Sequence, residues 1–77
     1  MAWSDEPTKG QLDAIYNLIQ WHTSVNTAAS ALQWLTDTAT RQEVSYELKR
    51  LRELSINHKL TEAECFNSKI WEGFDYV

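Results

Sequence analysis

The sequence predicts an all-α protein, a compact bundle of four short helices within one domain over residues 1–77. A threonine lies three residues before a Gln or Glu at three places, and this spacing is typical of a capping box at a helix N-terminus. Apolar residues then recur at helical spacing. There is no Asn-Gly or Asp-Gly turn and no sustained polar–apolar alternation, so strands are not expected.

The first capping signal is Thr8-Lys9-Gly10-Gln11, which predicts a helix over residues 9–22. Its inward face is expected to carry Leu12, Ile15, Tyr16 and Ile19. A second helix is predicted over residues 28–36, capped by Asn26 or Thr27. Its inward face is expected to carry Ala28, Ala31, Leu32 and Leu35, and Trp34 widens it.

The second signal is Thr40-Arg41-Gln42-Glu43, and it predicts a third helix over residues 41–56. The apolar stripe of that helix is Val44, Leu48, Leu51 and either Leu54 or Ser55. The third signal, Thr61-Glu62-Ala63-Glu64, predicts a fourth helix over residues 62–72, with a hydrophobic staple between Leu60 and Cys65. Its expected inward residues are Ala63, Phe66 and Ile70, and Gly73 is expected to end it in a left-handed conformation.

A chain of this length buries only about 60% of the surface that it exposes when unfolded, so its core must use large rings. Four Trp, three Tyr and two Phe supply them. The single cysteine excludes an internal disulfide and suits a reducing compartment. The N-terminus does not resemble a secretory signal, and no run approaches the roughly 20 apolar residues of a membrane span. We therefore expect a cytoplasmic protein without a membrane partner.

Candidate chemical groups are few. His22, His58 and Cys65 stand alone, without the spacing of a metal site, and there is no glycine-rich phosphate loop. The sequence therefore predicts no catalytic residue, no metal and no cofactor. Cys65 is interpreted as a small buried hydrophobe, with a reactive thiol as the alternative, because helix N-termini lower thiol pKa values.

Charge is unevenly distributed in a chain of net charge −4. Residues 41–59 carry five basic side chains against three acidic ones, whereas the remainder carries two against eight. The basic residues predicted to contact nucleic acid are Arg41, Lys49, Arg50, Arg52 and Lys59. The alternative is a solvated helix face with internal pairs Glu47–Arg50 and Lys49–Glu53, each worth about 0.2–0.5 kcal/mol.

The acidic remainder favours a different partner, the basic surface of another protein, reached by complementary charge. Tryptophan is enriched at the centres of interfaces. Trp3 and Trp34 are therefore candidate partner-binding residues, although closing the core would also explain a tryptophan in so small a protein.

Two segments, 8–18 and 40–51, resemble a small helical module similar to SAP domains, found in phage and bacterial proteins of DNA metabolism. They read Thr8-Lys9-Gly10-Gln11-Leu12-Asp13-Ala14-Ile15-Tyr16-Asn17-Leu18 and Thr40-Arg41-Gln42-Glu43-Val44-Ser45-Tyr46-Glu47-Leu48-Lys49-Arg50-Leu51. The chain departs from that module at Gly10 and Val44 and by its extra second helix. The resemblance covers about a third of the chain and implies a setting in DNA metabolism without assigning a site. Residues 48–70 also resemble short C-terminal helical hairpins that mediate oligomerisation.

The sequence thus favours a non-enzymatic helical binding module of phage or bacterial nucleic-acid metabolism, with a protein or nucleic acid as partner. In the phage case, it would act in the cytoplasm of the bacterial host. One alternative is an acidic inhibitor or adaptor of phage type that binds a host or defence protein. Another is a homo-oligomeric structural protein held together by its third and fourth helices.

Overall fold

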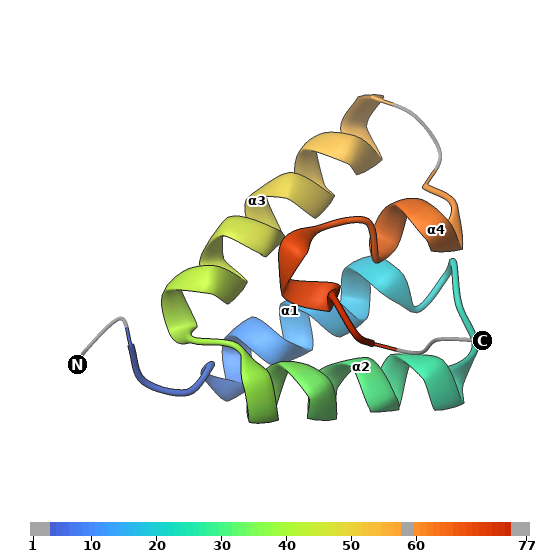
Figure 1. Ribbon diagram of the computed structural model, residues 1–77. Coiled ribbons are helices and arrows are strands. Elements are labelled where there is room, and N and C mark those ends of the chain that lie inside the picture. Colours follow the sequence, from blue (N-terminus) through green and yellow to red (C-terminus); the bar gives the residue numbers. More distant parts are fainter. Residues whose placement is uncertain (1–3, 58–59, 75–77) are drawn as a thin grey trace.

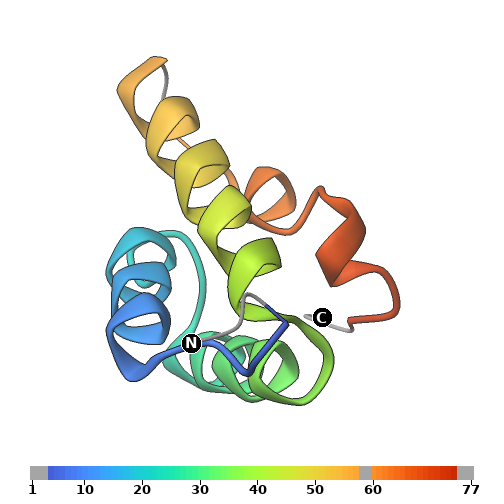
Figure 2. The same ribbon diagram turned by 90° about the vertical axis from the view of Figure 1, so that its left-hand side faces the viewer.

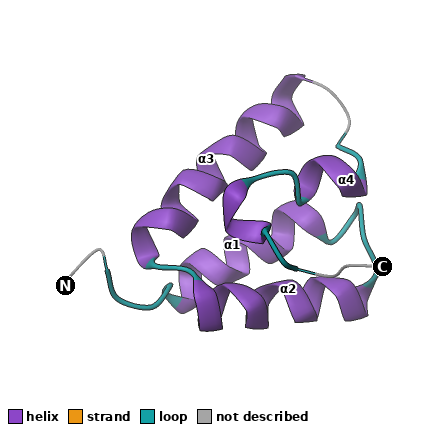
Figure 3. Cartoon of the chain, in the orientation of Figure 1, coloured by secondary structure: helices purple, strands orange, loops and turns teal. Residues whose placement is uncertain are grey.

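Four α-helices and one 3₁₀ turn form the secondary structure of the computed structural model, which describes residues 4–57 and 60–74 (Figure 3). They are α1 (Lys9–Ile19), α2 (Val25–Thr38), α3 (Arg41–Asn57), α4 (Glu62–Cys65) and η1 (Lys69–Trp71). The Cα radius of gyration is 11.5 Å, which matches the value of about 11.5 Å that a compact domain of this length should have. The predicted all-α fold class is confirmed.

The three long helices surround a common interior. α2 and α3 diverge from the short loop that joins them, and α1 packs against both (Figure 1). The chain from residue 60 to residue 74, which we call the C-terminal segment, lies on the opposite side of α3 from α1 (Figure 2). This segment contains only the short elements α4 and η1. Hydrogen bonds with Trp34 on α2 and with Glu47 and Arg50 on α3 hold it in place.

The threonine signals act as predicted. In all three capping boxes the threonine and the Gln or Glu three residues later exchange hydrogen bonds of 2.8–3.3 Å. The pairs are Thr8–Gln11, Thr40–Glu43 and Thr61–Glu64. Because both partners of each box lie within one helical turn, these helix starts are determined locally.

The core is one cluster to which all three long helices and the C-terminal segment contribute. Its fully buried large side chains are Ile15, Ile19, Leu35, Val44, Leu51 and Cys65. Most residues predicted to face inward are buried or packed against this cluster. Ala63 is the exception, since it is exposed.

The first two helices differ from their predicted bounds. α1 ends at Ile19 instead of residue 22, because the amide of His22 donates to the carbonyl of Ile19 at 3.0 Å and closes a tighter turn. α2 begins three residues before the predicted start, with Ser24 as its cap in place of Asn26 or Thr27. It also runs on to Thr38, whose hydroxyl donates back to the carbonyl of Trp34 at 2.7 Å.

The predicted fourth helix over residues 62–72 is wrong in its extent. α4 stops after Cys65, and only a 3₁₀ turn follows at Lys69–Trp71. An uninterrupted helix would use the carbonyls of Glu64 and Cys65 to accept from amides four residues later. Those carbonyls instead accept from the guanidinium of Arg50 on α3. A tertiary contact thus takes the carbonyls that would continue this helix. Within α4 the residue that faces the core is Cys65, which leaves Ala63 exposed.

Gly73 has the predicted left-handed backbone, with φ +91°, but it follows the 3₁₀ turn instead of a long helix. Within residues 4–57 and 60–74, no helix combines the length and apolar character needed to cross a membrane.

Candidate functional site

The basic residues of α3 point in different directions. Neighbours on one helix face are three or four residues apart, so Lys49 and Arg52 share a face, and both are exposed. Arg50 lies on the flank that meets the C-terminal segment, and Arg41 faces the chain that precedes α1. The fifth predicted contact, Lys59, lies outside the described residues. The structure therefore brings only Lys49 and Arg52 together as an outward basic pair.

Arg50 forms the helix pair with Glu47 that the sequence suggested as the alternative to phosphate contact. Its Nε donates to Glu47 Oε1 at 2.8 Å, and its Nη2 donates to Oε2. Glu47 is only 4% exposed and also accepts from Ser68 Oγ at 3.0 Å and from Trp71 Nε1 at 2.6 Å. We call these four residues the Glu47 cluster. A buried carboxylate is tolerated here because four donors replace its hydration.

The guanidinium of Arg50 has a second role at the end of α4. Nη1 donates to the carbonyl of Glu64 at 2.9 Å, and Nη2 donates to the carbonyl of Cys65 at 2.8 Å. The last carbonyls of a helix lack partners within it and favour a nearby cation. Arg50 thus caps α4 from another helix and holds the C-terminal segment on α3.

Arg41 is engaged with the chain that precedes α1. Its amide donates to the carbonyl of Asp5 at 2.7 Å, and its Nε donates to the carbonyl of Glu6 at 3.2 Å. Its own carbonyl accepts from Gln11 Nε2 at 3.1 Å. Its Nη1 is buried, without a hydrogen-bond partner in the described part of the chain. These contacts direct the Arg41 side chain toward the protein.

Trp34, a predicted partner-binding residue, joins α2 to the C-terminal segment. Its indole Nε1 donates to the carbonyl of Ile70 at 2.8 Å, and its ring lies 5.7 Å from that of Phe74. A Cβ added to Gly73 would lie 3.4 Å from Trp34 Cη2, so the left-handed turn follows the edge of the indole closely. Trp3, the other predicted partner-binding residue, lies outside the described residues.

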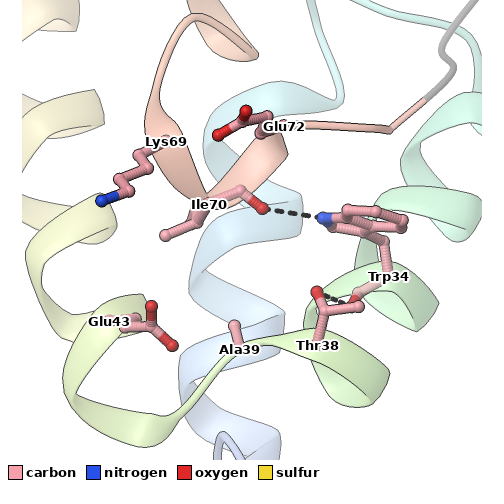
Figure 4. A pocket seen from close by; sticks show the side chains of 7 residues that line it. All are labelled: Trp34, Thr38, Ala39, Glu43, Lys69, Ile70 and Glu72. Carbon is pink, nitrogen blue, oxygen red and sulfur yellow. Dashed lines mark hydrogen bonds between the residues drawn. The ribbon is translucent and has the colours of Figure 1, made fainter.

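Beside Trp34, a groove runs between α2, α3 and the C-terminal segment. It consists of two hollows of about 620 and 250 Å³ that share Glu43, Lys69 and Ile70. Trp34, Thr38, Ala39 and Glu72 complete the larger hollow, shown in Figure 4. Tyr46, Glu47, Arg50 and Ser68 complete the smaller one. Three elements far apart in the sequence therefore form one concave surface, which we call the groove.

The groove has a half-buried apolar floor and exposed charges at its rim. Ile70 lies in the middle of the larger hollow, with the carboxylates of Glu43 and Glu72 on opposite sides of it (Figure 4). Lys69 also lines this hollow, but its ammonium end extends away from Trp34 (Figure 4). In this view Glu43 lies on the same side of Ile70 as the Lys69 ammonium, away from Trp34 (Figure 4).

Sequence reasoning missed two exposed aromatic side chains. Tyr46, on the rim of the smaller hollow, is 65% exposed, and Trp21, after the end of α1, is 79% exposed. For Trp21 the helical spacing could have indicated exposure, because Trp21 does not continue the apolar stripe that ends at Ile19. The groove itself had no sequence signal beyond Trp34, since its walls meet only in the fold.

Cys65 behaves as the sequence suggested for a small hydrophobe. Burial raises the pKa of its thiol to about 11; nearby carboxylates act in the same direction, and the Arg50 guanidinium opposes them. The thiolate is the reactive form, so this environment disfavours nucleophilic chemistry. Across the described ranges, no three His, Cys, Asp or Glu side chains are grouped in a way that could hold a metal ion.

Comparison of the chain with protein families, curated proteins and solved structures gives no match. The resemblance to SAP domains stays a prediction.

Proposed function

We propose that the protein is a non-enzymatic helical module that binds a partner protein in the groove. The observation that supports this most directly is the larger hollow, whose volume of about 620 Å³ lies within the range of about 300–1,000 Å³ that small-molecule pockets have and so leaves room for a side chain of a partner. Trp34 lies at one end of the groove and exposed Tyr46 at the other. Both residue types are enriched where proteins bind one another.

The walls of the groove are held in place before any partner arrives. The Thr40–Glu43 capping box orients Glu43 at the start of α3. The Glu47 cluster fixes the chain around Ser68, and the Trp34–Ile70 hydrogen bond fixes the next residues. A surface ordered in advance loses less conformational entropy on binding, which favours affinity.

A steric block in the groove tests this function. Thr38 is exposed and lines the larger hollow, so Thr38→Tyr should obstruct part of it. Ser30→Tyr places the same ring at an exposed position of α2 outside the groove and serves as the matched control. In affinity capture from the source organism's lysate, we expect one partner protein with the wild type and the control and its loss with Thr38→Tyr. Equal recovery by both variants, or no specific partner, would contradict the proposal.

The outward pair Lys49 and Arg52 supports a second function, contact with nucleic acid. Two phosphate contacts predict weak binding to duplex DNA, with a slope of about −1.8 in the logarithm of affinity against the logarithm of salt concentration. Lys49→Glu/Arg52→Glu should abolish that binding. Arg50 must stay unchanged in this test, because it caps α4. Absence of binding at low salt would exclude this function.

A further inference from the structure

We infer that the larger hollow of the groove receives an arginine side chain of the partner, seated beside Trp34 between Glu43 and Glu72. This inference rests on the proposed binding function and specifies the chemistry of the partner. It joins three properties of one place: two exposed carboxylates, an aromatic ring of fixed orientation, and an apolar floor.

The carboxylates give the hollow its preference for a cation. Glu43 comes from the first turn of α3 and Glu72 from the residue after η1. The amide of Thr40 donates to Glu43 Oε1 at 2.8 Å, so this carboxylate is held in one orientation. The single cation that lines the larger hollow, Lys69, extends away from its Trp34 end (Figure 4). A net charge of −4 on the chain further favours the approach of a basic partner.

Trp34 and the floor favour arginine over a small cation. The indole N–H is already used by the carbonyl of Ile70 and the ring also packs against Phe74, so the remaining half-exposed ring surface is what a ligand can contact. A guanidinium stacks on aromatic rings and can bind a carboxylate through two parallel hydrogen bonds. Ala39 and Ile70 offer apolar surface to the methylene stem that carries it. An arginine side chain matches all three properties of the hollow.

Nuclear magnetic resonance titration of the full chain at low salt provides the test. The probe is a blocked hexapeptide with two arginines and two leucines. One comparison peptide has citrulline in place of each arginine, which keeps the shape but removes the charge, and another has glutamate there. We expect the arginine peptide to perturb the Trp34 indole N–H and the amides of residues 38, 39 and 70. The citrulline peptide should bind at least about fivefold more weakly.

Four variants probe the charges separately. Glu43→Gln, which can keep its cap hydrogen bond, and Glu72→Gln should each weaken arginine-peptide binding by about 1.5- to fivefold, as expected for loss of one exposed ion pair. Lys69→Gln should tighten it by a similar factor, a gain that misfolding would not produce. Glu53→Gln, an exposed change on α3 outside the groove, should leave the affinity unchanged.

Equal binding of the arginine and citrulline peptides in the groove would overturn the arginine inference and leave the groove as a protein-binding site. Tighter binding of the glutamate peptide, or perturbations confined to other surfaces, would also overturn it. The inference is also overturned if none of the peptides perturbs the resonances of the groove at concentrations up to the millimolar range. The lysate capture with Thr38→Tyr then decides the proposed function independently.

Discussion

Replacing Arg50 by methionine should destabilise the fold far more than an exposed helix substitution. The wild-type guanidinium donates two hydrogen bonds to Glu47 and one to each of two α4 carbonyls. Methionine keeps an apolar stem of similar length but has no donor. The carboxylate of Glu47, which is only 4% exposed, then has only Ser68 and Trp71 as donors. Removing one partner of a buried ion pair costs about 3–5 kcal/mol.

The lower end of that range applies here, because 27% of the Arg50 side chain is exposed and water can reach the vacated space. A loss of about 3 kcal/mol corresponds to a fall in Tm of about 12–24 °C in a domain of this size. Urea and thermal unfolding followed by circular dichroism measure both quantities. Arg52→Met, on the exposed face of the same helix, should change stability by less than about 0.5 kcal/mol.

A double-mutant cycle separates the ion pair from the capping of α4. Glu47→Gln keeps an acceptor for Trp71 but removes the charge that pairs with Arg50. The cycle of Glu47→Gln with Arg50→Met should give a coupling energy of about 1–3 kcal/mol. A cost of less than about 1 kcal/mol for Arg50→Met, or a cost no greater than that of Arg52→Met, would show that the Arg50 guanidinium does not hold the C-terminal segment on α3.

Three further changes test other parts of the structure. The folded pKa of the Cys65 thiol lies near 11, above its ordinary 9.0. The unfolded chain therefore loses its proton first, and stability should fall by at most about 3 kcal/mol between pH 9 and 11. Cys65→Ala should reduce this loss of unfolding free energy, which urea unfolding at each pH measures. The same pH dependence in the wild type and the variant would contradict the raised pKa of the thiol. Gly73→Ala should cost about 1–2 kcal/mol through its left-handed backbone, and a neutral result in thermal unfolding would show that the turn relaxes away from Trp34. Thr40→Ala should cost about 1 kcal/mol by loss of its cap, whereas Ser30→Ala, at an exposed α2 position, should be nearly neutral; equal unfolding free energies for the two variants would argue against the cap.

Local signals in the sequence identified the fold class and the starts of α1, α3 and α4. A capping box needs only residues three apart, so Thr8, Thr40 and Thr61 could be interpreted without knowledge of the rest of the chain. Helical spacing likewise identified most of the core, including Ile15, Leu35, Val44 and Leu51.

The end of α4 could not be inferred in this way. The carbonyls that would have continued the helix accept from Arg50, which lies 14 and 15 residues earlier in the chain. Spacing along α3 alone showed that Glu47 could pair with Arg50. It could not show that Ser68 and Trp71 would join them, because those contacts cross 21 and 24 residues. The groove was equally inaccessible, since it exists only after the C-terminal segment is in place.

The dependence of α4 on Arg50 also bears on where the chain can be divided. A protein truncated before residue 60 would contain the sequence of α1, α2 and α3, but the carboxylate of Glu47 would lose its donors Ser68 and Trp71. An isolated peptide of residues 60–74 would have only one turn of α-helix and no guanidinium at its end. We therefore expect neither fragment to fold on its own, so a boundary for excision or fusion should not be placed between α3 and residue 60.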